Sequence, residues 1–138
     1  MPRLAHLLKY SLLPTLLVLA SCQAAGEGKA THMTQQELVR LIQLGTPPTI
    51  VDVRSEREYR QGHIQGAIHI PFWQSPFRAA DLAVPRNRTV VVYCAHGPRA
   101  GVGKFALKSA GFENVVYLQG HMSGWYKAGL PAVTGSQQ

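Results

Sequence analysis

Cys94 has the sequence surroundings of a nucleophilic thiol. It directly follows Thr89–Tyr93, an apolar run that predicts a buried strand, and it precedes an expected helix. In open parallel α/β sheets, ligands bind at the carboxyl ends of the strands. Arg99 adds a positive charge nearby, and Gly97 lets the loop curl so that backbone N–H groups converge on an anion. Both features favour the thiolate, which is the nucleophilic form of cysteine, so we interpret Cys94 as the catalytic residue.

Asp52 and Arg54 lie at the end of a second apolar run, Thr49–Val53. They could act as an acid–base pair, or they could tie a neighbouring loop to the Cys94 loop by hydrogen bonds. We favour the second role, in which the two side chains support the site without contacting a substrate.

The remaining polar and aromatic candidates receive structural interpretations. Glu56 and Glu58 are expected to face solvent on a short exposed helix. His63 and His69 have no partner at metal-ligand spacing, so we predict no metal site. The large aromatic side chains are expected in the core or in the wall of a pocket, namely Trp73, Trp125 and Tyr126.

The elements around these residues alternate between strand and helix. A length of 138 residues suits one domain, and 46% hydrophobic with 15% charged residues is a globular composition. Capping patterns at Thr34 with Glu37 and at Ser55 with Glu58 predict two helix starts. The expected strands are 30–33, 49–53, 67–70, 89–93 and 115–118, and the other expected helices are 73–83, 100–110 and 121–128. This alternation predicts an α/β domain with a parallel sheet.

The first 21 residues have the layout of an export signal. Arg3 and Lys9 precede the uncharged run Tyr10–Ala20, which spans only about 16 Å as a helix and is too short to cross a bilayer comfortably. The segment Leu19–Cys22 resembles a bacterial lipobox, in which the cysteine is lipidated and becomes the first residue of the mature chain. The alternatives are a plain signal peptide with an incidental cysteine and a buried N-terminal helix, which Pro14 would interrupt.

Lipidation of Cys22 implies an exported protein that is anchored to the periplasmic side of a bacterial membrane. Gln23 stands where an aspartate would retain such a lipoprotein at the inner membrane, so the outer membrane is favoured. Removal of residues 1–21 leaves twelve Lys and Arg against seven Asp and Glu, a net charge of +5. This charge suits small anions or lipid headgroups, whereas the dispersed cations and the exported location argue against nucleic acid as a partner.

Three ordered motifs give the chain a resemblance to the rhodanese (sulfurtransferase) family. Cys94-Ala95-His96-Gly97-Pro98-Arg99 is similar to the CxxGxR loop of that family. The other two motifs are Val51–Arg54 with Glu58-Tyr59 and Gly62–Ala67, and Gly111-Phe112 with Val115, Leu118–Gly120, Trp125 and Gly129–Pro131. The chain is accordingly divided into a signal peptide (1–21), a tether (22–33), a rhodanese-like domain (34–131) and a tail (132–138).

The resemblance implies a single three-layer α/β domain, with a central parallel sheet of about five short strands and helices on both faces. It implies a sulfurtransferase in which Cys94 accepts sulfane sulfur from a donor such as thiosulfate, as a persulfide, and passes it to a thiophilic acceptor such as cyanide or a thiol. The loop residues Ala95, His96, Gly97, Pro98 and Arg99 would bind the donor, and Lys104 would add positive charge. No metal or organic cofactor is implied, and we expect a monomer.

Two residues depart from the family pattern. Ala100 replaces a serine that often follows the loop arginine, which removes one hydroxyl donor near the bound anion. His121 stands where the second glycine of a pair is frequent, and we expect it to have a packing or local hydrogen-bonding role.

Two other functions remain open at this stage. Related Cys–Arg loops on this fold serve phosphatases and arsenate reductases, but those loops are one residue longer than Cys94–Arg99. A persulfide carrier or redox-sensing module that acts on a partner protein would use the same six-residue loop. In that case small molecules would be turned over poorly.

Overall fold

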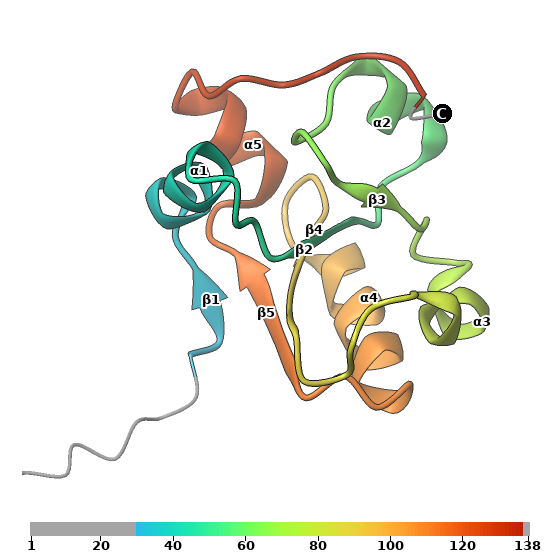
Figure 1. Cartoon of the computed structure of the whole chain (residues 1–138). Coiled ribbons are helices and arrows are strands. Elements are labelled where there is room, and N and C mark those ends of the chain that lie inside the picture. Colours follow the sequence, from blue (N-terminus) through green and yellow to red (C-terminus); the bar gives the residue numbers. More distant parts are fainter. Residues whose placement is uncertain (1–29, 137–138) are drawn as a thin grey trace, which may run out of the picture.

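Five short strands form one parallel sheet in the computed structural model of the chain, which describes residues 30–136 (Figure 1). The strand order is β1-β5-β4-β2-β3, and each neighbouring pair is parallel. The central strand is the one with the most continuous apolar sequence, which is typical of a strand buried on both faces. The strands are β1 (His32–Met33), β2 (Thr49–Asp52), β3 (Ile68–His69), β4 (Thr89–Tyr93) and β5 (Asn114–Leu118).

Helices connect the strands and cover both faces of the sheet, which confirms the predicted fold class (Figure 1). Thr34 and Ser55 act as N-caps of the first two helices. Each side-chain oxygen accepts a hydrogen bond from the backbone N–H three residues later, that of Glu37 or Glu58. The helices are α1 (Gln35–Gln43), α2 (Glu56–Gln61), α3 (Ser75–Arg78), α4 (Pro98–Ser109) and α5 (His121–Lys127).

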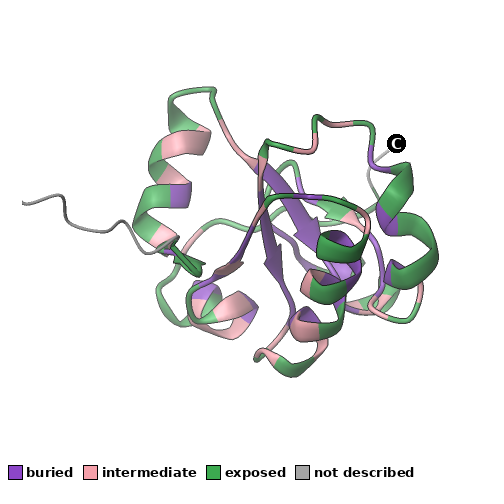
Figure 2. Ribbon diagram, turned by 90° about the horizontal axis from the view of Figure 1, so that it is seen from below, coloured by how far each residue is buried: buried purple, intermediate pink, exposed green. Residues whose placement is uncertain are grey.

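The alternation of side chains along β4 separates two cores, one on each face of the sheet. Val90 and Val92 pack in a cluster with Leu107 of α4. On the opposite face, Val91 and Tyr93 pack in a cluster with Trp125 of α5. Figure 2 shows the buried sheet between helices whose outer faces are exposed. The expected core position of Trp125 is therefore confirmed, since its side chain is almost completely buried.

The segment 73–83 differs from the single helix that the sequence predicts. Only α3 is α-helical, and a 3-10 turn at Ala79–Asp81 follows it before the chain becomes extended at Leu82. Ala79 and Leu82 reach the core, whereas Phe77 is 82% exposed and Trp73 is 50% exposed. Of the two positions predicted for Trp73, core or pocket wall, the core is excluded: its ring packs edge-on against the neighbouring Phe72 and is half exposed to solvent.

The ends of the described chain contact the domain. The lipobox cysteine Cys22 and the tether up to residue 29 lie outside the described residues, as does the predicted signal peptide. Residues 32–33 of the expected tether form β1, and Val133 of the expected tail exchanges two backbone hydrogen bonds with His63. Within residues 30–136, no helix is both long enough and apolar enough to span a bilayer.

Candidate active site

Cys94 lies at the carboxyl end of β4, in a loop that turns directly into α4. Its side chain is buried, and Sγ accepts a hydrogen bond of 2.9 Å from the Gly97 N–H. Gly97 has a φ of +131°, which L side chains rarely adopt, and Pro98 begins the helix immediately afterwards. The predicted curl of the loop is thus present, with the Gly97 N–H directed at the sulfur. Cys94 is free of any disulfide.

The N-terminal turn of α5 holds the other side of this loop. The N–H groups of Met122 and Ser123 donate to the carbonyls of Cys94 and Ala95, at 3.0 and 3.1 Å. The exposed His96 contacts the same helix, with 3.1 Å between its Nδ1 and the Ser123 Oγ. Backbone and side-chain bonds therefore fix the loop to an element that follows it by more than twenty residues.

Arg99 is not a free cation above the loop, because it forms an ion pair with Glu58 of α2. Nη1 and Nη2 donate to the two carboxylate oxygens at 2.7 and 2.8 Å. The expectation that Glu58 faces solvent was therefore wrong, since about a third of its side chain is exposed and both oxygens are occupied. The signal in the sequence was the capping box with Ser55, which fixes Glu58 in the first turn of α2, close to the end of β2.

The ion pair shifts the pKa values of both Glu58 and Arg99. The hydrogen bonds from Arg99 hold the pKa of Glu58 well below its usual range, against the opposing effect of burial, and Ser55 contributes in the same direction. The same bonds raise the pKa of Arg99, and the charge of Cys94 adds to that shift. Glu58 therefore remains ionised and offsets part of the positive charge that Arg99 presents to an incoming anion.

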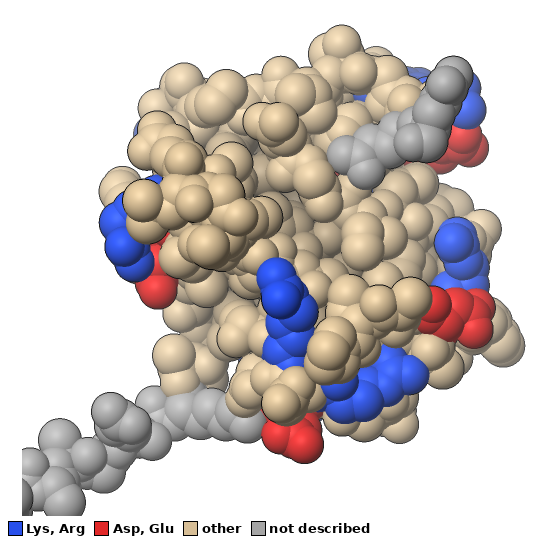
Figure 3. Space-filling view, viewed as in Figure 1, with Lys and Arg blue, Asp and Glu red and all other residues tan. Residues whose placement is uncertain are grey.

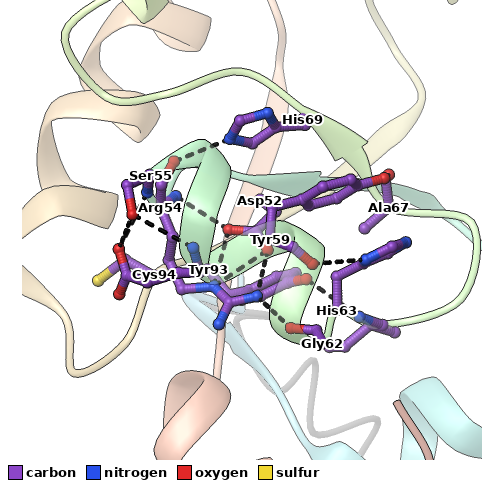
Figure 4. A network of polar contacts seen from close by, with 12 residues as sticks. Asp52, Arg54, Ser55, Tyr59, Gly62, His63, Ala67, His69, Tyr93 and Cys94 are labelled. Atoms are coloured by element: carbon purple, nitrogen blue, oxygen red, sulfur yellow. Dashed lines mark hydrogen bonds and ion pairs between the residues drawn. The ribbon is translucent and has the colours of Figure 1, made fainter. Parts of the chain in front are cut away.

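Asp52 and Arg54 form a buried pair beside Cys94 (Figure 4). The Arg54 Nη2 donates to Asp52 at 2.7 Å and to the Gly62 carbonyl at 2.7 Å. Its guanidinium carbon also lies 5.6 Å from the centre of the Tyr93 ring, at the end of β4. The pair thus ties the end of β2 to the segment that follows α2, and it reaches the Cys94 loop through Tyr93 rather than by a direct hydrogen bond.

Tyr59 packs between two histidines, His63 and His69 (Figure 4). Its ring stacks on His63 at 3.7 Å and on His69 at 4.6 Å between ring centroids. His63 Nδ1 lies 2.9 Å from the Tyr59 carbonyl, and His69 Nε2 lies 2.9 Å from the Arg54 carbonyl. These histidines have packing roles, and no cluster of metal-ligating side chains occurs among the residues that the structure describes.

Lys104 does not join the Cys94 loop as the sequence suggested. Its Nζ lies 4.2 Å from the centroid of the Tyr117 ring, in a separate cavity that it shares with Lys108 and His32. The position follows from α4 itself, because Lys104 is five residues beyond Arg99 and therefore more than one turn further along the helix. On the face drawn in Figure 3, the basic side chains stand in separate groups rather than in one stripe.

A cleft of about 270 Å³ lies beside the loop, next to Ala95 and His96. Tyr126 forms part of its wall, as predicted, and donates a hydrogen bond of 3.0 Å to the Gly62 carbonyl. The cleft is lined by Arg54, Glu58, Ala95, His96, Ser123 and Tyr126, among others. The arrangement combines a buried thiol with a backbone donor directed at its sulfur, in a loop that also carries Arg99, and this suits nucleophilic attack on a small anionic substrate.

Known proteins are similar to this chain in sequence and in fold. Residues 34–128 match the rhodanese-like domain. Over 65 residues the chain is 40% identical to the thiosulfate sulfurtransferase PspE of Escherichia coli (strain K12), which covers 47% of this chain and 62% of PspE. It is 32% identical over 132 residues to the probable adenylyltransferase/sulfurtransferase MoeZ of Mycobacterium tuberculosis; the match covers 94% of this chain but only 32% of MoeZ.

A solved structure agrees with the architecture described above. The Alr3790 protein from Anabaena sp. superposes with a TM-score of 0.67 at 32% identity, over 75% of this chain and 82% of that one. The family match begins at Thr34, the N-cap of α1, and ends at Ala128, the C-cap of α5. It therefore includes the Cys94 loop and every element that contacts it, and the chain belongs to the rhodanese-like domain family.

Proposed function

We propose that the protein is a sulfurtransferase that uses a small sulfane-sulfur anion, with thiosulfate as the model donor. The observation that carries the proposal is the hydrogen bond of 2.9 Å from the Gly97 N–H to the Cys94 sulfur. Cys94 is the first residue of a six-residue loop that ends in Arg99. The similarity to the thiosulfate sulfurtransferase PspE supports the same donor class.

The reaction consists of two displacements at sulfur. The Cys94 thiolate attacks the outer sulfur of thiosulfate, the S–S bond of the donor breaks, and sulfite leaves with the bonding electron pair. This gives a persulfide, Cys94–S–S⁻. A thiophilic acceptor such as cyanide or a thiolate then attacks the terminal sulfur, which breaks the new S–S bond and regenerates the Cys94 thiolate. No proton, metal or redox cofactor enters this balance.

The described residues have distinct roles in this scheme. The Gly97 N–H stabilises negative charge on the thiolate first and on the persulfide afterwards. Arg99 uses Nη1 and Nη2 to bind Glu58, and a guanidinium has five N–H donors, so N–H groups remain for a donor oxygen. Ala95 and the exposed His96 line the cleft beside the loop, where the donor would approach.

The test is intact-mass analysis of the wild type and of Cys94→Ala after incubation with thiosulfate. We expect the wild type to gain one sulfur atom and the variant to gain none, while urea unfolding of the variant stays cooperative. Steady-state kinetics with thiosulfate and cyanide then separate an enzyme from a carrier, since a carrier would form the persulfide but turn over slowly. Turnover of an aryl phosphate at a comparable kcat/KM would overturn the proposal and favour the phosphatase class.

We also propose that Cys22 is lipidated and anchors the domain to the periplasmic face of a bacterial membrane, with the outer membrane favoured. The support is the lipobox-like segment Leu19–Cys22 after a short apolar run. Expression of the full chain and of Cys22→Ser in a bacterial host tests the anchor. The wild type should remain in the membrane fraction after a carbonate wash and carry acyl mass on Cys22, whereas the variant should be soluble or unprocessed. Equal membrane association of the two forms would contradict the anchor.

A further inference from the structure

His121 has a backbone conformation that its residue type does not favour. Its φ is +51°, and it is the only non-glycine residue with a positive φ among residues 30–136. Gly120 before it has a φ of +74°, so two left-handed residues follow one another at the start of α5. This turn of the backbone lets the N–H groups of Met122 and Ser123 reach the carbonyls of Cys94 and Ala95. A glycine at 121 would take the same conformation without the steric cost of a Cβ.

The imidazole of His121 contacts the Cys94 loop at two points. Its Nδ1 accepts a hydrogen bond of 3.4 Å from the Cys94 N–H. Its Nε2 lies 3.4 Å from the place where a Cβ on Gly97 would be, so the ring fills the space that the missing side chain leaves. The ring therefore touches both the residue that carries the sulfur and the residue whose N–H holds that sulfur.

The surroundings keep this imidazole neutral at ordinary pH. Burial lowers the pKa of His121, and the nearby His32 of β1 and His96 of the loop act in the same direction. The ring of Tyr117 lies 6.1 Å from the His121 ring, between centroids, and the Lys104 Nζ lies over that same tyrosine ring, 4.2 Å from its centroid. A neutral ring has a lone pair on Nδ1 for the Cys94 N–H, and its proton is then on Nε2.

We infer that His121 is a positioning residue for Cys94: its Nδ1 accepts the Cys94 N–H, and this hydrogen bond holds the loop in the curl that directs the Gly97 N–H at the sulfur. The inference rests on the proposed function, because the sulfur held in this way is the one that would carry the persulfide. Left-handed backbone strain at a functional site fits this role, since the surrounding contacts maintain a conformation that the residue alone would not adopt.

Two variants of the full chain separate the hydrogen bond from the backbone. His121→Gly relieves the left-handed strain but removes the acceptor. His121→Asn retains an acceptor, because its Oδ1 occupies about the place of Nδ1, and asparagine tolerates the left-handed region better than most residues. The readout is the rate of alkylation of Cys94 by iodoacetamide against pH, measured on the peptide that contains Cys94, together with urea unfolding of the same samples.

We expect stability and reactivity to move in opposite directions in His121→Gly. The variant should unfold at the same or a higher urea concentration. Half-maximal alkylation should need a pH higher by about half a unit, which is roughly a threefold loss of thiolate below that pH. The kcat/KM for thiosulfate should fall by a similar factor, and His121→Asn should stay close to the wild type in all three measurements.

Two results would overturn the inference. One is wild-type alkylation of His121→Gly, and the other is a His121→Asn variant as impaired as His121→Gly, which would assign the effect to ring packing alone. Failure of the proposed function is a separate result: the wild type would then form no persulfide with thiosulfate, while the alkylation profiles of the variants would still report on the position of Cys94.

Discussion

At the scale of single residues, the arginine of the loop is held by a pair that spans 41 positions of the sequence. Glu58 accepts hydrogen bonds from both terminal nitrogens of Arg99 and from the hydroxyl of Ser55. The guanidinium is thereby fixed in orientation beside the loop. A planar, fixed guanidinium can bind Glu58 and a donor oxygen at once, whereas an ammonium group acts as a point charge without this directionality.

Arg99→Lys should therefore impair sulfur transfer although the charge is kept. We expect kcat/KM for thiosulfate to fall by at least about tenfold, which corresponds to roughly 1.4 kcal/mol of transition-state stabilisation. Steady-state kinetics of both proteins at neutral pH provide the measurement. If kcat/KM is unchanged, the backbone N–H groups of the loop bind the anion without help from Arg99.

Glu58 should also make the stability of the fold depend on acid pH. Its pKa is lowered in the folded state, so the carboxylate stabilises the fold above the unfolded value of about 4.3 and loses that effect as the pH falls. The free energy of unfolding should decrease below about pH 5, and Glu58→Gln should show a smaller decrease. Urea unfolding from pH 6 to pH 3 measures this, with Glu56→Gln as the control because its pair with Arg60 is mostly exposed.

At the scale of elements, α2 places Glu58 and α5 places His121 against the same loop. The capping box of α2 uses Ser55 and Glu58 reciprocally, so the residue that begins the helix also orients the partner of Arg99. Helix α1 begins with a simpler cap, in which the Thr34 side chain accepts the Glu37 N–H. The two helix starts provide a comparison between a cap that serves the site and one that serves only its helix.

Ser55→Ala and Thr34→Ala should both cost about 1 kcal/mol of unfolding free energy, the usual value for the loss of an N-cap. Only Ser55→Ala should also lower kcat/KM for thiosulfate, because Glu58 loses the hydroxyl that helps to orient it. Urea unfolding and steady-state kinetics of the two variants test this. A Thr34→Ala variant that loses as much activity as Ser55→Ala would show that stability alone explains the effect.

At the scale of the whole molecule, the fold class could be predicted because it depends on local patterns. The alternation of apolar runs with capped helices gives the five strands and their parallel arrangement, and the Cys94 loop was placed correctly at a strand end. The contacts around that loop could not be predicted. Glu58 and His121 reach it from positions 41 and 27 residues away from their partners. Contacts between residues so far apart in the sequence depend on how the helices pack, and the spacing of residues within one element does not reveal that packing.

The two outer strands of the sheet, β1 and β3, have only two residues each. A sheet grows between molecules through rows of unpaired N–H and C=O groups, and very short edge strands offer few of them. We expect a monomer in sedimentation velocity at micromolar concentration, and a concentration-dependent dimer would contradict this. With the lipid anchor that we propose, many copies would share one membrane surface at high local density. Short edges would then let these copies crowd together without joining into a continuous sheet, so that each active-site loop stays separately accessible.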